Sequence, residues 1–218
     1  MKKFLDLDNI EAVIFDMDGT MIDNMTTHKA AWKEFCLRKE IRLTDEDFKK
    51  KISGLRNDQI FVNLFGQNLT KEQIKSYAQE KESVYRELYR PIIHEVAGLS
   101  ELLKRIHQKN IRLAVATTAP VDNRNFAFEA LGNRNVFEVV LGEESVTKGK
   151  PDPEIYLKTA DLLQVRPNGC LVFEDTPVGV KSALNAGMRV VGIATSHSFD
   201  ELSAAELVVT NFLDIELR

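Results

Sequence analysis

Short apolar runs recur along the chain, with segments of helical character between most of them. The runs occupy residues 12–15, 111–116, 136–141, 170–173, 190–193 and 207–209. Their apolar residues are mostly continuous rather than alternating, as expected for strands that are covered on both faces of a parallel sheet. Helical signals occupy residues 99–107, 154–163 and 178–186. This alternation predicts an α/β fold with a doubly wound (Rossmann-like) parallel sheet.

One long interval, from about residue 24 to residue 89, lacks a strong strand signal. Helical patterns cover residues 25–38, 45–51, 58–65 and 70–89. So much helix exceeds what a crossover between neighbouring strands requires. The pattern therefore predicts an α-helical cap inserted after the first strand. We place the cap at residues 23–94 and the α/β core at residues 1–22 and 95–218, with hinges near the two junctions.

Composition excludes several classes of protein. The chain has 218 residues, of which 44% are apolar, and its formal net charge is −4. The apolar fraction argues against disorder, and a slightly acidic chain without a basic face argues against nucleic acid or an anionic membrane as partner. No apolar run approaches a membrane span, and the acidic start does not form a signal-peptide core. We expect a cytoplasmic protein in which Cys36 and Cys170 are buried, reduced thiols.

Two acidic residues follow the first apolar run. Asp16 and Asp18 lie two residues apart in an extended segment, so their side chains can face one site. Gly19 permits a sharp turn and a close approach to a substrate. Open α/β sheets bind their ligands at the carboxyl ends of the strands. One carboxylate there can attack phosphorus while the second acid protonates the leaving oxygen.

Hydroxyl groups and a lysine follow in the chain. Thr117 and Thr118 end the run at 111–116, and their hydroxyl and backbone N–H groups suit phosphoryl oxygens. Lys150 lies in a Lys-Pro-Asp-Pro segment. Its ammonium can neutralise both an attacking carboxylate and the phosphate that this carboxylate approaches.

A second acid pair, Glu174 and Asp175, ends the run at 170–173. These carboxylates would repel Asp16 unless a cation lay among them, and oxygen ligands beside a phosphate suit Mg²⁺. Taken singly, each group also has an ordinary structural interpretation as a turn residue, a helix cap or a solvated lysine. Their joint occurrence, each at or just beyond a predicted strand end, favours a common site.

Four stretches carry a resemblance to a known family. They are residues 13–23 (VIFDMDGTMID), 114–118 (AVATT), 148–156 (KGKPDPEIY) and 172–180 (VFEDTPVGV). In this order the sequence resembles the haloacid dehalogenase-like superfamily over nearly its whole length. The helical insert is similar to that of the branch with a small α-helical cap, which includes sugar-phosphate phosphatases and β-phosphoglucomutase. For this cap type the resemblance implies a monomer.

The resemblance implies a role for each matching residue. Asp16 would be the nucleophile that becomes an aspartyl-phosphate, and Asp18 would be the general acid and then the base for water. Thr117 would bind the phosphoryl group, and Lys150 would secure it alongside Asp16. Asp18 favours phosphoryl transfer over carbon–halogen cleavage, because true dehalogenases of this superfamily lack the second aspartate. The implied Mg²⁺ ligands are Asp16, the backbone carbonyl of Asp18, Asp175 and Glu174.

The start of the cap, residues 23–32 (DNMTTHKAAW), resembles that of β-phosphoglucomutase. His28 would assist cap closure and Trp32 would line the substrate pocket, although both also suit ordinary helix-surface and core positions. The mutase grips a second phosphate with an arginine three residues after a glycine, where this chain has Asn57. Arg56 lies one position earlier, which turns its side chain by about 100° on a helix. Arg56 is thus a candidate substrate contact, and mutase activity is in doubt.

We therefore predict a Mg²⁺-dependent phosphatase that hydrolyses a small phosphorylated metabolite, such as a sugar or polyol phosphate. A β-phosphoglucomutase is the nearest alternative. A non-enzymatic phospho-receiver domain also uses an acid pair, a threonine and a lysine at strand ends. The aspartate that a receiver phosphorylates follows its third strand, separate from the acid pair, which argues against that class. A binding protein that has lost catalysis has little support, because all the expected catalytic side chains are present.

Overall fold

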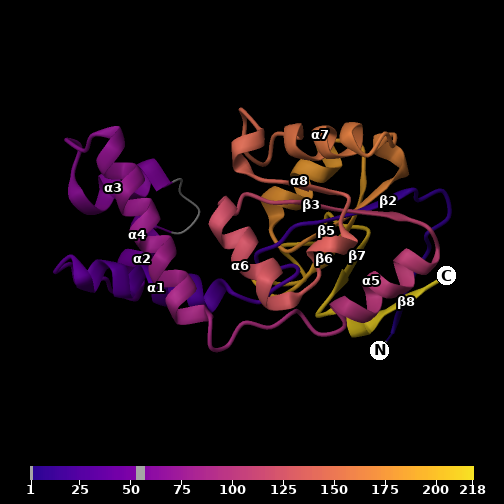
Figure 1. Cartoon of the computed structure of the whole chain (residues 1–218), viewed down its shortest axis with the longest axis horizontal. Coiled ribbons are helices and arrows are strands. Elements are labelled where there is room, and N and C mark those ends of the chain that lie inside the picture. Colours follow the sequence, from indigo (N-terminus) through magenta and orange to yellow (C-terminus); the bar gives the residue numbers. More distant parts are fainter. Residues whose placement is uncertain (1, 53–56) are drawn as a thin grey trace. The chain divides into compact units, whose positions relative to one another are not determined.

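The computed structural model describes residues 2–52 and 57–218. The chain forms two compact units, one of Met1–Asp23 with Ile93–Arg218 and one of Asn24–Ile92. The first unit is an α/β core and the second consists of helices and their connections (Figure 1). In the described ranges, no helix is both long enough and apolar enough to cross a membrane.

The core contains a six-stranded parallel sheet in the order β4-β3-β2-β5-β6-β7. Its strands are β2 (Ala12–Phe15), β3 (Arg112–Ala116), β4 (Val139–Leu141), β5 (Cys170–Glu174), β6 (Arg189–Ile193) and β7 (Leu207–Val209). The predicted α/β class is confirmed. The run at 136–141 is shorter as a strand than expected, because it begins in a 3₁₀ turn, η1 (Arg134–Val136).

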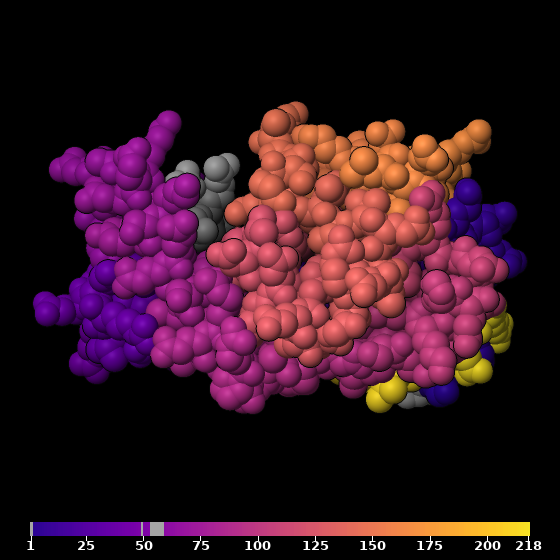
Figure 2. All heavy atoms as spheres, viewed as in Figure 1, coloured from indigo at the N-terminus to yellow at the C-terminus, as the bar shows by residue number. Residues whose placement is uncertain are grey.

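Helices cover both faces of the sheet, which explains the continuous apolar runs. They are α5 (Leu99–Gln108), α6 (Val121–Leu131), α7 (Glu154–Leu162) and α8 (Pro177–Asn185). Ile14 packs in a cluster with residues of α7 and α8. Phe15 points to the opposite face, where its ring stacks on Phe173 at 4.9 Å between centroids. In Figure 1, α7 and α8 lie on one side of the sheet and α5 on the other. Figure 2 shows the same view with every heavy atom as a sphere, and the strands are hidden behind surface atoms.

Three elements of the core lie outside the predicted set. Helix α6 buries the polar residues Asn123 and Arg124, so the sequence shows no clear apolar stripe there. Strands β1 (Lys3–Leu5) and β8 (Ile215–Leu217) pair in parallel as a separate two-stranded sheet. Each is only three residues long, too short for a periodic signal. Short 3₁₀ turns complete the core: η2 (Glu143–Ser145), η3 (Pro167–Gly169) and η4 (Phe212–Asp214).

The helical unit, called the cap below, has an aromatic interior. Its helices are α1 (Met25–Arg38), α2 (Asp45–Lys51), α3 (Asn57–Phe65) and α4 (Lys71–Tyr89). The side chains of Thr44 and Thr70 accept hydrogen bonds from backbone N–H groups that begin α2 and α4. Phe61 has no exposed surface, and its ring lies 5.5 Å from Trp32 and 5.9 Å from Phe35. These aromatic side chains therefore form the interior of the cap.

Candidate active site

The first acidic residue, Asp16, follows the buried strand β2, which lies between β3 and β5. Its backbone N–H donates to the carbonyl of Phe173 at 3.0 Å, which continues the parallel ladder with β5. Asp16 is buried, with 6% of its surface exposed. The register Phe15↔Phe173 places Asp16 beside the end of β5, where Glu174 lies. The ends of two strands remote in sequence thus meet at one point.

Lys150 joins these two strand ends. Its Nζ donates to Oδ1 of Asp16 at 2.6 Å and to Oε1 of Glu174 at 2.6 Å, and 7% of its side chain is exposed. The loop that carries Lys150 is anchored by Glu154, which opens α7. One oxygen of Glu154, Oε2, accepts from the backbone N–H groups of Thr147 (2.9 Å) and Lys148 (2.8 Å). Lys150 is therefore held against the two acids by its loop and by its own ion pairs.

Glu174 uses both of its carboxylate oxygens on protein partners. Oε1 also accepts from the hydroxyl of Tyr156 at 2.9 Å, and Oε2 accepts from the backbone N–H of Asp175 and from the hydroxyl of Thr176, each at 3.0 Å. A Cβ at Gly179 of α8 would lie 1.8 Å from Oε1, so only glycine leaves room for this carboxylate. The role of Glu174 as a direct metal ligand stays a prediction.

Asp175 faces the turn that follows β2. Its Oδ1 accepts from the hydroxyl of Thr20 at 3.2 Å, and its Oδ2 contacts the hydroxyl of Ser196. Gly19 has φ +78°, and a Cβ there would lie 2.0 Å from Oδ2 of Asp175. A side chain at position 19 would therefore displace this carboxylate as well as strain the turn. The turn of the first motif and the end of β5 are in direct contact.

The electrostatics of the cluster reflect buried acids that outnumber the lysine. Burial, together with the charges of Glu174 and Asp18, raises the pKa of Asp16 to about 7 although Lys150 opposes the shift. Burial and the charges of Glu174 and Asp16 hold the pKa of Asp175 well above its usual range. Burial alone would lower the pKa of Lys150, but Asp16 and Glu174 raise it well above its ordinary value. The site therefore carries an excess of acidic groups that a further cation would stabilise.

The donor set fits a hard divalent cation in its chemistry. Asp16, Glu174 and Asp175 supply carboxylate oxygens, the ligands that Mg²⁺ prefers. In the part of the chain that the structure describes, no three His, Cys, Asp or Glu side chains already surround one potential metal position. The carboxylates contact Lys150, Thr20 and Ser196 instead. The site therefore suits a divalent cation through its negative charge and through the carboxylate oxygens that it offers as ligands.

The remaining predicted core residues occupy the same edge of the sheet. Thr117 is buried after β3, and its hydroxyl accepts from the backbone N–H of Ala119 at 3.1 Å. Thr118, next to it, is exposed. Asp18 is half-buried, and its backbone pairs with Ile22 in an isolated bridge. Its charge acts on Asp16, so the two acids of the first motif lie near each other.

Two of the predicted cap residues, His28 and Trp32, lie beside the buried Lys81 within the cap. His28 stacks on Tyr85 with 4.0 Å between ring centroids, and its Nδ1 lies 3.0 Å from Nζ of Lys81. Lys81 is 4% exposed and lies over the ring of Trp32, 5.1 Å from its centroid. Trp32 is itself buried among aromatic side chains. Arg56, the third cap candidate, lies outside the described residues.

Besides Thr176, whose hydroxyl donates to Glu174, sequence reasoning missed three side chains that touch the acids. Tyr156 lies two residues beyond Glu154 in α7, and its role could have been suspected from the third motif alone. Thr20 ends the Asp-x-Asp-Gly-Thr turn, where its hydroxyl faces Asp175. Ser196 follows β6, a strand end at which no candidate was predicted, although β6 neighbours β5 in the sheet.

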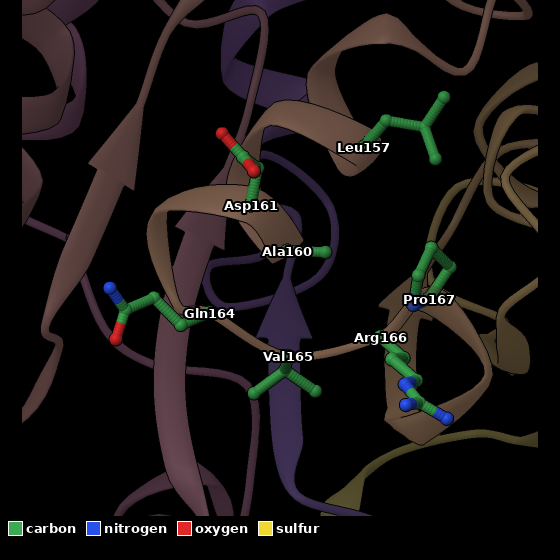
Figure 3. A pocket seen from close by; sticks show the side chains of 7 residues that line it. All are labelled: Leu157, Ala160, Asp161, Gln164, Val165, Arg166 and Pro167. Atoms are coloured by element: carbon green, nitrogen blue, oxygen red, sulfur yellow. The ribbon is translucent and has the colours of Figure 1, made fainter.

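A surface hollow of about 400 Å³ lies elsewhere in the core, at the end of α7 and the start of η3 (Figure 3). It contains none of the predicted site residues. Its lining residues are Leu157, Ala160, Asp161, Gln164, Val165, Arg166 and Pro167. The acid–lysine cluster, rather than this hollow, carries groups suited to phosphoryl chemistry.

The family model described as haloacid dehalogenase-like hydrolase matches residues 13–193. This range includes most of β2, all of β3 and β5, and the loop of Lys150. The chain belongs to the haloacid dehalogenase-like hydrolase family, as the resemblance implied.

Relatives with assigned activities are similar over most of the chain. A phosphorylated carbohydrates phosphatase of Thermotoga maritima is 30% identical over 88% of this chain and 88% of its own. The β-phosphoglucomutase of Bacillus subtilis is 28% identical over 96% of this chain and 93% of its own. A chloroplastic 5-amino-6-(5-phospho-D-ribitylamino)uracil phosphatase of Arabidopsis thaliana is 26% identical over 94% of this chain, which spans 55% of that relative's length.

A solved structure is similar in fold as well. The family IA, variant 3 hydrolase of Entamoeba histolytica superposes with a TM-score of 0.87 and is 32% identical, covering 95% of this chain and 96% of its own. The likeness extends over both units of the chain in sequence.

Proposed function

We propose that the protein is a cytoplasmic, Mg²⁺-dependent phosphatase that acts as a monomer on a small phosphorylated metabolite. The observation that carries the proposal is the contact of Lys150 with Asp16 and Glu174, each at 2.6 Å, at the carboxyl ends of β2 and β5. This contact supports the proposal because it holds the carboxylate of Asp16, the proposed nucleophile, beside the positive charge of Lys150. The phosphatases among the relatives support the reaction class.

In the proposed reaction, an oxygen of Asp16 attacks phosphorus and the bond between phosphorus and the alcohol oxygen breaks. Asp18 gives its proton to that oxygen, and the alcohol leaves. Water then attacks the aspartyl-phosphate while Asp18 accepts one of its protons. The bond between phosphorus and Asp16 breaks, which releases inorganic phosphate and restores the carboxylate.

The other residues would bind and orient. Lys150 neutralises charge on Asp16 and on the phosphoryl oxygens, and Thr117, Thr118 and Gly19 offer hydroxyl and backbone donors to those oxygens. Asp16, Asp175 and the backbone carbonyl of Asp18 would hold Mg²⁺, with Glu174 as a further ligand. Bound Mg²⁺ would offset the negative charge of the acids and of the phosphate.

The substrate class that we propose is a sugar or polyol phosphate. Its support is the phosphorylated carbohydrates phosphatase among the relatives. In this proposal the cap closes over the substrate, excludes water during the first step and supplies specificity. His28 and Arg56 would be the cap residues that contact the substrate, whereas the burial of Trp32 favours packing within the cap.

The test is a phosphate-release screen over sugar, polyol, nucleotide and glycolate phosphates with Mg²⁺. Asp16→Asn should lower turnover of the best substrate by at least about 10⁴-fold, because it removes the nucleophile. Asp8→Asn, an exposed aspartate of the same unit, is the matched control and should retain full activity. Hydrolysis of that substrate by folded Asp16→Asn at the wild-type rate would refute the proposal.

A β-phosphoglucomutase is the second candidate, favoured by the mutase of Bacillus subtilis among the relatives. The two reactions differ in what accepts the phosphoryl group, namely water or the reoriented sugar. The protein is therefore mixed with β-glucose 1-phosphate and a bisphosphate primer. Glucose 6-phosphate that forms faster than inorganic phosphate would favour the mutase, and the reverse order would favour the phosphatase.

A further inference from the structure

The loop that follows β6 belongs to none of the four motifs, but it contacts two of them. β6 neighbours β5 in the sheet, with Phe173 paired to Val191 and Glu174 to Gly192. This register carries the residues after β6 to the same edge as Asp175. There the hydroxyl of Thr195 contacts the carbonyl of Gly19, and the hydroxyl of Ser196 contacts Asp175. The loop thus bridges the turn of the first motif and the acid of the fourth.

Ser196 contacts Asp175 at two atoms. Its Oγ lies 3.0 Å from the backbone carbonyl of Asp175 and also contacts Oδ2 of the same residue. Nδ1 of His197 lies 2.8 Å from this Oγ and 3.1 Å from the carbonyl of Asp175. A serine hydroxyl has one proton to donate. When the Ser196 hydroxyl donates this proton to the carboxylate of Asp175, it cannot also donate to Nδ1 of His197. Nδ1 then carries a proton and donates to the Ser196 hydroxyl and to the Asp175 carbonyl.

The orientation of Asp175 therefore depends on two hydroxyl groups. Thr20 contacts Oδ1 and Ser196 contacts Oδ2, and the carboxylate lies against the turn at Gly19, where a Cβ would be 2.0 Å from Oδ2. Asp175 is 1% exposed, so water is a poor substitute for a lost partner. Partners of this kind fix the direction in which a ligating carboxylate points, and their loss typically weakens metal binding by about 10–100-fold.

We infer that Ser196 is a positioning residue that orients Asp175 towards the cation, and that Thr195 fixes the turn at Gly19 in register with it. The inference rests on the proposed function, because it takes Asp175 as a ligand of the cation. Ser196 touches neither the substrate nor the reacting atoms in this assignment. Its effect is on cation affinity, while the chemistry belongs to Asp16 and Asp18.

The experiment is a titration of the whole chain with Mn²⁺, in which free Mn²⁺ is measured by electron paramagnetic resonance and Mg²⁺ competes. Ser196→Ala should raise the dissociation constant for Mn²⁺ by about 10-fold. Ser196→Thr keeps the hydroxyl and should restore affinity to within about 3-fold of wild type. Ser198→Ala is the matched control, since Ser198 is exposed and donates to Glu201 at 2.7 Å.

Activity supplies a second readout. In Ser196→Ala the loss of turnover should be large at low Mg²⁺ and should shrink as Mg²⁺ approaches saturation. Should Ser196→Ala fail to fold, Thr195→Val removes the neighbouring hydroxyl and is expected to weaken Mn²⁺ binding in the same direction.

Two outcomes would overturn the inference. The first is a folded Ser196→Ala variant with wild-type affinity for Mn²⁺, and the second is a wild-type chain that binds no divalent cation. A wild-type chain that binds Mn²⁺ but hydrolyses no phosphate ester would refute the proposed function alone. Weaker Mn²⁺ binding by Ser196→Ala would then still support the positioning role.

Discussion

Both units of the chain bury a lysine, but they surround it differently. In the core, Lys150 meets Asp16 and Glu174, which lie 134 and 24 residues away in sequence. In the cap, Lys81 donates to Glu82, its sequence neighbour, at 2.8 Å and lies over the ring of Trp32. Both lysine side chains are buried, with 5% of the Lys81 side chain and 7% of the Lys150 side chain exposed.

The difference teaches how burial of charge relates to function. Lys81 is paired locally and covered by aromatic rings, an arrangement that a helical unit can build for its own packing. Lys150 is held by strands that only the complete sheet brings together, among acids that outnumber it. Such an arrangement costs folding free energy, and buried ionisable groups with shifted pKa values cluster at functional sites. We therefore expect changes at Lys150 to appear mainly in activity and changes at Lys81 mainly in stability.

The largest effect should follow from replacing the two lysines by methionine, which keeps side-chain length and removes the charge. Lys150→Met should lower kcat/KM on the best phosphate ester by about 10³-fold, because the charge facing the phosphoryl group is lost. Lys81→Met should lower the free energy of unfolding by about 1–3 kcal/mol, because it deprives Glu82 of a buried partner. Phosphate release and urea unfolding, measured on both variants, compare the two lysines. Near-wild-type activity of Lys150→Met would contradict the expected difference between them.

A smaller effect should follow from filling the space beside Glu174. Gly179→Ala places a methyl group 1.8 Å from Oε1, so the carboxylate must move away from Lys150. We expect a loss of about 1–3 kcal/mol in unfolding free energy, as for other overpacked sites, together with lower activity. Gly149→Ala is the control, since no atom lies within 4 Å of its added methyl. Equal stabilities of the two variants in urea would contradict the crowding at Gly179.

The smallest effect concerns the thiols, one in each unit. Burial raises the pKa of Cys36 and of Cys170 to about 11 in each case. At pH 8 both are then protonated and shielded, so labelling by a disulfide reagent should require opening of the unit that holds each thiol. We expect Cys36 to label at lower urea than Cys170, because the smaller cap buries less surface. Mass spectrometry of the labelled chain identifies the site, and the opposite order would show the cap to be the more stable unit.

Much of the fold follows from periodicity in the sequence. Strand β2 and helix α1 have the predicted bounds. A continuous apolar run is a strong local signal, and helical spacing places the buried Ala31, Trp32 and Phe35 on one face of α1. The meeting of Asp16 with Lys150 and Glu174 was also predictable, since carboxyl ends of parallel strands share one edge of the sheet.

What escaped prediction depends on long-range packing. Ser196 acquires its contact only because β6 lies beside β5, and strand order is not written in local periodicity. Phe61 is fully buried and the ring of Tyr77 lies 5.9 Å from it in the cap. Helical spacing alone does not show whether such residues face a substrate or the interior of the cap. Helix α6 was missed because Arg124 occupies its buried face, where it donates to the carbonyl of Ala119 at 2.7 Å.

The insertion of the cap after β2 also sets an order of events during synthesis. β2 leaves the ribosome before β3 and β5, the two strands that it pairs with, and residues 24–92 come between. The cap is contiguous in sequence, so it can form its aromatic interior before β3 and β5 have been synthesised. In a nascent chain the apolar run at 12–15 thus lacks both neighbouring strands until β3 has been made, and it lacks the second until β5 follows.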